Sequence, residues 1–295
     1  MIERENIYAV VVWYHPTAAM RANIDSYIGH VRHVVVVDNS PENNSTLLGD
    51  MSGQCTYLPL GDNKGIATAL NRGCQEAIAQ GAEWILTMDQ DSCWEEKQLA
   101  GYIQLANAYP EIEQTGVFSP RQDYVSHMRD YAATYEEKIA VMTSGCLLSA
   151  AGFRATGGFR DELFIDEVDN EYCMHIRRMG LKVVVVNKAF LAHQLGELRT
   201  IRFLGLWCKE YIDHEPWRFY YMTRNNLLLS HWYPEYQRFN TKRLKKMLKR
   251  IVLYDRQHKF AALRACWRGR CDARKMIVEE KKHHRNEEKR LQVGA

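Results

Sequence analysis

Two aspartates, Asp89 and Asp91, directly follow the apolar run of residues 84–88, with Gln90 between them. If the strand continued, residues two apart would share a face about 6.5 to 7 Å apart along the chain, and Gln90 would turn away. Two carboxylates side by side repel each other unless a cation lies near them. Because Mg²⁺ and Mn²⁺ prefer oxygen ligands, we predict that Asp91 binds a metal and Asp89 meets a ligand hydroxyl. The alternative is a strand-end pair in a solvated loop.

Further side chains that could do chemistry follow other apolar runs. Asp38 ends one such run, and His193 ends the run "AFLAH". In "FIDEVDNEYC", Asp166 and Asp169 share a face if a helix begins near residue 166. Acidic residues at a helix start also compensate the helix dipole, and this is the alternative to a role in chemistry. It applies more to Asp166 and Glu167 than to Asp169, which lies further into the predicted helix. His193 is a metal ligand if a metal lies beside it, and otherwise a surface residue.

The elements that position these residues alternate along the first half of the chain. The expected strands cover residues 7–14, 33–38, 55–60 and 83–88, and the expected helices cover residues 16–31, 62–81 and 95–109. This alternation predicts an α/β fold with a mainly parallel sheet that is buried on both faces. Ligands of such sheets bind outside the carboxyl ends of the strands, so Asp38, Asp89 and Asp91 should face one crevice. In the second half, we expect strands at residues 139–153 and 181–197 with a helical segment between them.

The C-terminal region differs in charge from the rest of the chain. From residue 242 on there are 18 Lys and Arg against 6 Asp and Glu, and the first 241 residues have 21 against 30. A predicted helix there has one apolar stripe, which comprises Leu244, Met247, Leu248, Ile251 and Val252. A basic amphipathic helix is typical of a segment that lies on an anionic membrane surface. The alternative is a helix packed on the body with a solvated basic face, and we expect no nucleic-acid binding because the region has few aromatic residues for stacking.

Composition excludes several other classes of protein. The chain has 295 residues, 46% of them apolar, which fits one large domain or one domain with an appendage. Its longest apolar runs are shorter than the roughly 18 to 20 residues of a membrane span, and the charged N-terminus does not look like a signal peptide. The eight cysteines form no CxxC pair, which argues against a zinc site or a disulfide framework. We therefore expect a cytoplasmic protein that is peripheral on the inner face of the cell membrane.

Seven segments in order carry a resemblance: "VVVVDNS", "DNKGIATALN", "MDQDS", "TSGCLLS", "GGFRDELFIDEVDNEYCMHIRRMG", "LAHQLGE" and "YYMTRNN". Over about residues 5–235 the chain resembles family 2 inverting glycosyltransferases, most of all the rhamnosyltransferases of bacterial surface-polysaccharide assembly. The resemblance implies a GT-A fold, which is Rossmann-like, with a mixed, mainly parallel sheet. A nucleotide-binding half of about residues 1–115 and an acceptor half of about 116–235 would together form the domain 1–235, and residues 236–295 would be a basic helical extension.

The resemblance also implies roles for acidic residues and one histidine. Asp38 would hold the base or ribose of the nucleotide. Asp89 and Asp91 would be the D-x-D pair that binds the metal and diphosphate. Asp169 aligns with the aspartate of the family's E-D motif, which is the expected catalytic base. His193 matches a histidine that often completes the metal or diphosphate site.

Further residues would contact the nucleotide. Asn63, Lys64 and Gly65 would lie along it, with the glycine permitting close approach of the backbone, and Arg224 could meet phosphate. The chain also departs from the family pattern. The usual "TYNP" is "WYHP" here, and the arginine common after the E-D motif is His175. These departures leave the metal and base roles in place and bear on how the nucleotide or acceptor is held.

The expected reaction is an inverting transfer of a sugar, with dTDP-L-rhamnose as the expected donor and a sugar hydroxyl of a glycan or lipid-linked saccharide as acceptor. Asp169 would remove the hydroxyl proton, and Mg²⁺ or Mn²⁺ would neutralise the departing diphosphate. Two alternatives remain at this point. One is a phosphatase of the haloacid-dehalogenase type, because "ILTMDQDS" also fits its nucleophile strand. The other is a non-catalytic scaffold that binds a nucleotide-sugar.

Overall fold

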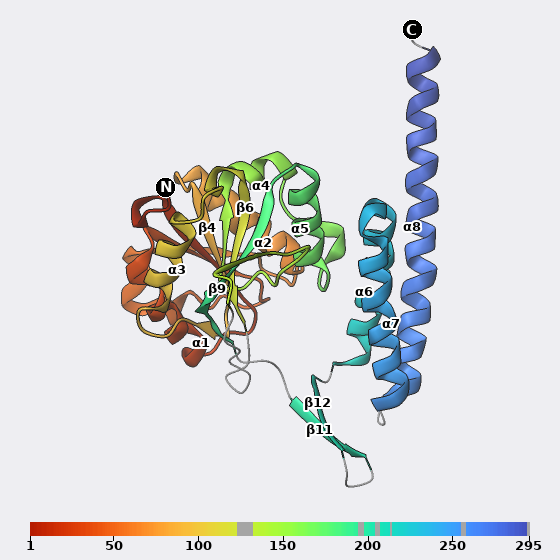
Figure 1. Ribbon diagram of the computed structural model, residues 1–295, viewed down its shortest axis with the longest axis horizontal. Helices are drawn as coiled ribbons and strands as arrows, with labels where there is room; N and C mark the ends of the chain where they lie inside the picture. The colour runs from red at the N-terminus through yellow and green to blue at the C-terminus, as the bar shows by residue number, and fades with distance from the viewer. Residues whose placement is uncertain (123–131, 194–197, 204–206, 213, 255–257, 294–295) are drawn as a thin grey trace. The chain divides into compact units, whose positions relative to one another are not determined.

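The computed structural model describes residues 1–293 except 123–131, 194–197, 204–206, 213 and 255–257. Within it the chain forms two compact units (Figure 1). The first unit comprises Met1–Phe164 and Val168–Gln194, and the second comprises Ile165–Glu167 and Leu195–Ala295. The structure thus divides the chain near residue 194, whereas the sequence suggested a boundary near 235. The difference arises because helix α6, Pro216–Trp232, packs along helix α8, Lys259–Val293.

A mixed sheet forms the centre of the first unit. Its strands and the short strands beside it are β1 Ile7–Trp13, β2 His33–Asp38, β3 Cys55–Pro59, β4 Trp84–Asp89, β5 Ser92–Cys93, β6 Thr115–Arg121, β7 Tyr135–Glu137, β8 Cys146–Ser149, β9 Lys182–Phe190 and β10 Ala192–His193. In the described part of the chain, eight strands form this sheet in the order β3-β2-β1-β4-β8-β6-β9-β7. Strand β1 is parallel to both β2 and β4, and β8 runs antiparallel to β4 and β6. The predicted mixed, mainly parallel sheet flanked by helices is confirmed.

Helices cover both faces of the sheet (Figure 1). The helices of the first unit are α1 Ala18–Ala22, α2 Ile66–Ala79, α3 Gln98–Asn107, α4 Ala150–Thr156 and α5 Val168–Arg178, with 3-10 turns η1 Arg4–Asn6, η2 Asn23–Ser26, η3 Ile28–His30, η4 Ser45–Gly53, η5 Ile112–Gln114 and η7 Asp161–Leu163. Alternate residues of a strand point to opposite faces, and β1 shows this plainly. Val11 belongs to the core cluster that includes α3, while Val10 points toward Gly73 of α2. A Cβ on Gly73 would lie 2.4 Å from Val10, so glycine permits α2 to approach the sheet closely.

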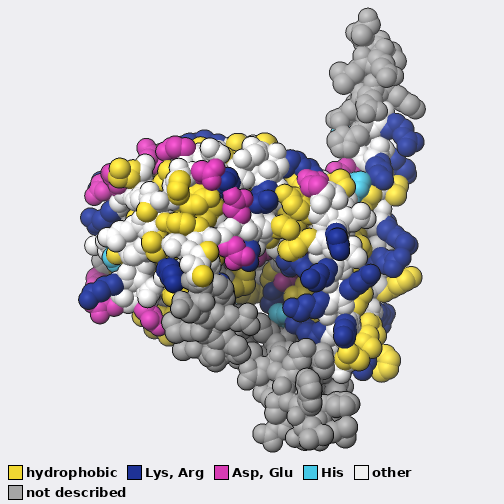
Figure 2. All heavy atoms as spheres, in the orientation of Figure 1, with side chains coloured by type: hydrophobic (Ala, Val, Ile, Leu, Met, Phe, Trp, Pro, Cys, Tyr) yellow, Lys and Arg dark blue, Asp and Glu magenta, His cyan; other side chains and the backbone are white. Residues whose placement is uncertain are grey.

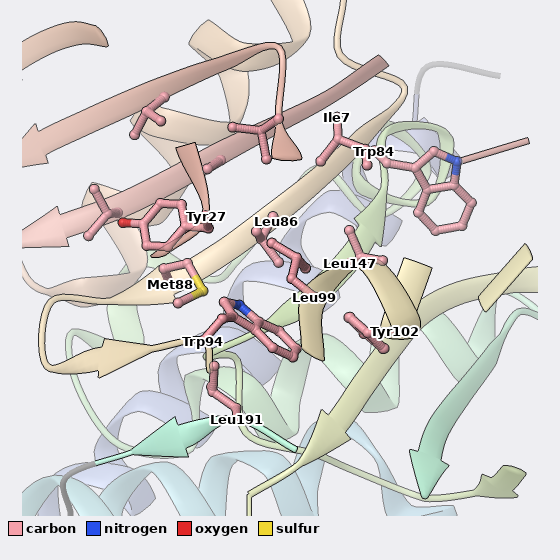
Figure 3. Close-up of a cluster of buried hydrophobic side chains, with 14 of the residues drawn as sticks. Ile7, Tyr27, Trp84, Leu86, Met88, Trp94, Leu99, Tyr102, Leu147 and Leu191 are labelled. Carbon is pink, nitrogen blue, oxygen red and sulfur yellow. The ribbon is translucent and has the colours of Figure 1, made fainter. Parts of the chain in front are cut away.

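The core on the α3 face is rich in aromatic residues (Figure 3). Trp94 stacks on Tyr102 of α3 with ring centroids 5.3 Å apart, and both are buried with Leu86 of β4 and Leu147 of β8. Such aromatic pairs contribute about 0.5 to 1.5 kcal/mol beyond the area they bury. Because Trp94 follows the short strand β5, this packing fixes the segment that carries Asp91 against the core.

Two expected elements differ in the structure. The helix expected over residues 16–31 is broken into α1, η2 and η3, because the Asn23 side chain donates to the Gln90 carbonyl at 2.8 Å and the Ser26 hydroxyl donates to the Asn23 carbonyl. The strand expected over 139–153 is reduced to β8, because Gly145 has φ 76° and turns the chain before it. After β8 the chain enters α4, where the Ser149 hydroxyl accepts from Gly152 N–H and caps the helix.

The second unit is mostly helical. Besides α6 and α8 it contains β11 Leu198–Phe203, β12 Trp207–Ile212, η8 Pro234–Tyr236 and α7 Gln237–Tyr254. A Cβ on Gly269 of α8 would lie 2.4 Å from the Tyr220 carbonyl oxygen of α6, so the two helices cross with their backbones close together. In the described part of the chain, no helix is both long and apolar enough to cross a membrane.

The apolar stripe predicted on α7 is mainly a packing surface. Ile251 is buried in a small core with Phe219 and Ala262, and Met247 and Leu248 pack against that core. Val252, by contrast, is half exposed. Most of the stripe therefore stabilises the second unit itself.

Candidate active site

The D-x-D pair lies in a turn and not on a continuing strand. Strand β4 ends at Asp89, and Gln90 and Asp91 form the turn that leads into β5. The spacing expected from an ideal strand is therefore wrong, since the backbone changes direction between the two aspartates. Both aspartates are partly exposed.

Gln90 holds this turn against the end of β1. Its side-chain oxygen accepts from the Tyr14 N–H at 2.8 Å, and its side-chain nitrogen donates to the Tyr14 carbonyl at 3.1 Å. The Gln90 amide thus makes a backbone-like pair of hydrogen bonds with Tyr14. The turn is fixed before any ligand binds, which lowers the entropy that binding must overcome.

Ser144 holds the other side of the turn, and sequence reasoning did not identify it. Its hydroxyl accepts from the Asp89 N–H at 3.0 Å and donates to the Ser92 hydroxyl at 2.8 Å, and its side chain is buried. Gly145 beside it donates its N–H to the Thr87 carbonyl at 2.7 Å. The small residues in "TSGC" were the available signal, because only small side chains fit where the loop meets the end of β4.

The charges of Asp89 and Asp169 both act on one buried thiol, that of Cys146. Burial is the main cause that raises the pKa of Cys146 well above its ordinary value, and the charges of Asp169 and Asp89 raise it further. Both carboxylates are therefore within electrostatic reach of Cys146, at the start of β8 next to the end of β4. The D-x-D turn and the candidate base thus both act electrostatically on the start of β8.

The proposed metal ligands are only partly described. Strand β5 pairs with β10 so that His193 lies opposite Ser92, the residue that follows Asp91. The side chain of His193 is outside the described residues, and among the described ones no cluster of three acidic, histidine or cysteine side chains could hold a metal ion. The donor types, two carboxylates and the histidine whose backbone pairs beside them, nevertheless fit Mn²⁺ or Mg²⁺.

Asp38 is fully buried and hydrogen-bonded within the protein. Its carboxylate accepts from the Ser40 N–H at 3.1 Å, from the side chain of Asn44 at 2.9 Å and from the Tyr57 hydroxyl at 2.5 Å. Burial would raise the pKa of Asp38, but the hydrogen bonds from Ser40, Tyr57 and Asn44 together lower it below its ordinary value. Asp38 therefore orders the loop 38–44, and its expected contact with a nucleotide stays a prediction.

Replacing Tyr57 by phenylalanine should lower the free energy of unfolding at pH 7 by about 1.5 to 3 kcal/mol, the usual range for a hydrogen bond to a charged group. Because the folded pKa of Asp38 is lowered, its contribution is full above the unfolded pKa of about 3.9 and is lost as pH falls through the folded value. The loss should therefore shrink in urea titrations near pH 3. Tyr8→Phe is the control, since the Tyr8 hydroxyl donates to the neutral carbonyl of Gln80 and its cost should not depend on pH in this range. A pH-independent cost for Tyr57→Phe would contradict this role of Asp38.

Asn63, Lys64 and Gly65 form a compact loop next to Asn39. The Asn39 side chain donates to the Asn63 side-chain oxygen at 3.1 Å and accepts from the Lys64 N–H at 2.8 Å. Asn39 follows Asp38 directly, so the two predicted nucleotide segments meet. Sequence reasoning missed Asn39, although it lies inside the quoted motif "VDNS". The Lys64 side chain is half exposed and pairs with Asp62 at 3.2 Å.

Gly65 is required by packing against another part of the protein. It has φ 86°, and a Cβ there would lie 2.5 Å from the Phe164 ring and 2.7 Å from the Phe164 carbonyl oxygen. That carbonyl accepts from the Ile66 N–H at 2.7 Å. The close approach that the glycine permits is thus to the loop that precedes Asp169. The Asp169 carboxylate accepts from the Asn170 N–H at 2.8 Å and is partly exposed.

Arg224 lies in the second unit. Its guanidinium carbon is 4.8 Å from the centre of the Tyr221 ring and 5.6 Å from that of Tyr220, and its Nε donates to the Asn225 side-chain oxygen at 2.8 Å. The structure thus shows how Arg224 is held within its own unit, and its proposed contact with phosphate stays a prediction.

A separate cavity in the first unit lies between α2 and the segment that follows α4. It is lined by Asn71, Arg72, Arg160, His175 and other residues, and none of the predicted site residues lines it. Burial, followed by the charges of Arg160 and Arg178, lowers the pKa of His175. His175, which replaces the arginine common in the family, is therefore a neutral side chain near pH 7.

Comparison with known proteins identifies the family of the chain. A model of glycosyl transferase family 2 matches residues 17–158. The dTDP-rhamnosyl transferase RfbF of Shigella flexneri is 31% identical over 251 residues, which cover 76% of this chain and 79% of that protein. Galactofuranosyltransferase GlfT1 of Mycobacterium tuberculosis is 28% identical over 256 residues, which cover 77% of this chain and 83% of that protein.

A solved structure shows the same fold. Residues 1–349 of TarS from S. aureus, in complex with UDP-GlcNAc, superpose with a TM-score of 0.57 at 13% identity, covering 88% of this chain and 79% of that chain. The phosphatase and scaffold alternatives are not retained, because the relatives are glycosyltransferases. The chain is 31% identical to RfbF over 76% of its own length. It is therefore a glycosyltransferase of the GT-A fold and belongs to glycosyl transferase family 2.

Proposed function

We propose that the protein transfers L-rhamnose, with inversion, from dTDP-L-rhamnose to a sugar hydroxyl of a glycan or lipid-linked acceptor in surface-polysaccharide synthesis. The observation that carries the proposal is the 31% identity to the dTDP-rhamnosyl transferase RfbF. The charges of Asp169 and Asp89, which both raise the pKa of the buried Cys146 thiol, support a single transfer site. The similarity to RfbF supports rhamnose as the sugar, whereas the similarity to GlfT1 supports galactofuranose.

A comparison of donors tests the proposal. Thermal unfolding of the wild-type chain with Mn²⁺ should show its largest upward shift of Tm with dTDP-L-rhamnose, because a ligand that binds the native state stabilises it by mass action. Release of dTDP in the presence of saccharide acceptors should follow the same order. UDP-galactofuranose and UDP-GlcNAc serve as the comparison donors. A larger Tm shift and faster turnover with either of them would show that it, and not dTDP-L-rhamnose, is the preferred donor.

In this reaction Asp169 is the proposed catalytic base, which removes the proton from the acceptor hydroxyl as its oxygen attacks the anomeric carbon. A carboxylate in this position commonly contributes about 10² to 10⁴ in rate. Asp169 is partly exposed at the start of α5, so an acceptor can reach it. The charges of Asp169 and Asp89 both act on Cys146, which supports the assignment.

Asp91 and His193 are the proposed ligands of Mg²⁺ or Mn²⁺, with Asp89 directed to the donor. A divalent cation there would neutralise negative charge on the diphosphate leaving group. The support is the donor set itself, together with the register that puts His193 opposite the residue after Asp91. Asn63, Lys64 and Gly65, with the loop ordered by Asp38, are the proposed contacts to the nucleotide, and Arg224 the proposed contact to phosphate.

An anionic membrane surface is the proposed partner of the C-terminal region, which would make the protein peripheral on the inner face of the membrane. Three exposed apolar residues of α8, Phe260, Trp267 and Val278, are 7 and 11 residues apart and therefore share one side of the helix. Exposed Arg264 and Lys275 lie on the same side. Figure 2 shows Lys and Arg side chains gathered over the helices of this unit. Apolar side chains framed by basic ones are typical of helices that lie on anionic lipid.

Co-sedimentation with vesicles tests this surface. The wild-type chain should bind phosphatidylglycerol vesicles and bind phosphatidylcholine vesicles weakly. Phe260→Ser together with Trp267→Ser should weaken binding at least about tenfold, because burying each ring contributes about 1.5 kcal/mol or more. The control is Met142→Ser with Met179→Ser, two exposed apolar residues of the first unit. Equal binding by both double variants would remove this surface from the proposal.

A further inference from the structure

The loop that precedes Asp169 has an unusual backbone conformation. Among the described residues, five other than glycine have a positive φ, and three of them lie in this loop: Phe164 at 63°, Asp166 at 61° and Glu167 at 63°. The left-handed region is unfavourable for residues with a Cβ, so such a run persists only where surrounding contacts impose it. This loop leads directly into the first turn of α5, which carries Asp169.

Side chains of α6 and α7 supply those contacts. Arg218 binds both carboxylate oxygens of Asp166, at 2.7 Å through Nη2 and 3.3 Å through Nε. The side-chain nitrogen of Asn225 donates to the carbonyls of Ile165 and Asp166, each at 2.8 Å. Every one of these groups belongs to the second unit, and Asn225 is fully buried.

A second arginine holds the last residue of the loop. Arg243 of α7 donates through Nη2 to Glu167 Oε1 at 3.0 Å, and Glu167 is buried. Glu167 is followed by Val168, the first residue of α5, and then by Asp169. Each of residues 165, 166 and 167 is thus held by a side chain that follows it by more than 50 positions in the chain.

The orientation of the Asn225 amide is fixed by its neighbour. Arg224 Nε donates to the Asn225 side-chain oxygen at 2.8 Å, which directs the amide nitrogen toward the two carbonyls. Arg224 is itself held over the rings of Tyr220 and Tyr221. The segment "YYMTRNN" therefore has a structural purpose that its proposed contact with phosphate does not explain.

We propose that Arg218, Asn225 and Arg243 are positioning residues that hold the strained loop 164–167 and thereby set the place of Asp169 for proton removal. At its first residue the loop is anchored where the Phe164 carbonyl accepts from Ile66 N–H and Gly65 packs beneath it. Within the first unit, residue 164 is thus held by the segment proposed to contact the nucleotide, and within the second unit, residues 165–167 are held by side chains of α6 and α7. This inference rests on the proposed role of Asp169 as the base.

The test separates positioning from simple stability. Arg218→Ala and Asn225→Asp should lower kcat by up to about 10²-fold, the cost of misplacing a catalytic group by about 1 Å, while KM for the donor changes less than about threefold. Arg218→Lys, which keeps the charge and loses the paired hydrogen bonds, should lower kcat less than Arg218→Ala does. Arg243→Ala should likewise lower kcat. Its matched control is Arg238→Ala, an exposed arginine on the same helix whose kcat should equal that of the wild type. Circular dichroism and Tm verify that each variant is folded.

A double-variant comparison gives the decisive readout. In an Asp169→Asn background, Arg218→Ala should reduce the residual kcat by less than about threefold, because the group that Arg218 positions is already gone. The same loss in both backgrounds, or unchanged kcat in folded Arg218→Ala and Asn225→Asp, would overturn the positioning role and leave the base assignment intact. Full activity of Asp169→Asn alone would overturn the base assignment and the positioning role with it.

Discussion

Replacement of Asp169 by asparagine is expected to lower kcat by about 10² to 10⁴-fold with little change in KM for the donor. The substitution keeps the size of the side chain and its ability to accept from the Asn170 N–H, but removes the carboxylate that accepts the proton. The measurement is steady-state kinetics with dTDP-L-rhamnose and a saccharide acceptor. The loss should fall on kcat because the base acts only as the acceptor oxygen attacks.

The matched control is Glu162→Gln, an exposed carboxylate seven residues earlier, which should retain wild-type kcat. If Asp169→Asn turns over at the rate of this control, Asp169 is not the base. A loss confined to KM would instead assign Asp169 to binding of the donor or acceptor.

Replacement of Asp91 by alanine is expected to abolish metal-dependent transfer, lowering turnover by about 10³-fold or more. A metal that neutralises a leaving diphosphate contributes several kcal/mol of transition-state stabilisation, and Asp91 is its proposed ligand. The fold should remain, because Asp91 lies partly exposed in a turn held by Gln90 and Ser144. Release of nucleoside diphosphate with Mn²⁺ or Mg²⁺ measures the loss, and Tm without ligand verifies the fold.

Chelation provides an independent comparison for the same site. EDTA should reduce wild-type turnover to about the level of Asp91→Ala and should have little further effect on the variant. Glu95→Ala, an exposed acid four residues later, should behave like the wild type. Near-normal turnover of Asp91→Ala in buffer that contains the metal would remove Asp91 from the metal site.

The parts of the fold that the sequence predicts are those with a strong local signal. The valine run in β2 identified a strand buried on both faces, and Val34–Val37 are indeed fully buried. The apolar spacing of residues 66 to 78 identified α2, because a helix that packs on a sheet repeats its apolar positions every 3.6 residues. The order of these elements then placed Asp38 and Asp89 at one end of the sheet.

The parts that the sequence does not predict depend on contacts between distant residues. Ser144 and Asp89 are 55 positions apart, and Asn225 and Ile165 are 60 positions apart, so no local sequence pattern predicts either hydrogen bond. The sequence predicted the end of a strand near Gln90 and not a turn. The turn depends on the hydrogen bond between Gln90 and Tyr14, which are 76 positions apart in the chain. The stripe on α7 looked like a membrane-facing surface because helical spacing shows which residues share a face but not what covers them.

A crystal structure of the Asp169→Asn variant with dTDP-L-rhamnose and Mn²⁺ tests the central claim most directly. The account predicts that the metal and diphosphate bind at the turn that carries Asp89 and Asp91, with His193 beside the metal and the substituted side chain at position 169 facing the anomeric carbon of the sugar. Donor bound with its diphosphate away from that turn, or a side chain at position 169 that faces away from the anomeric carbon, would contradict it.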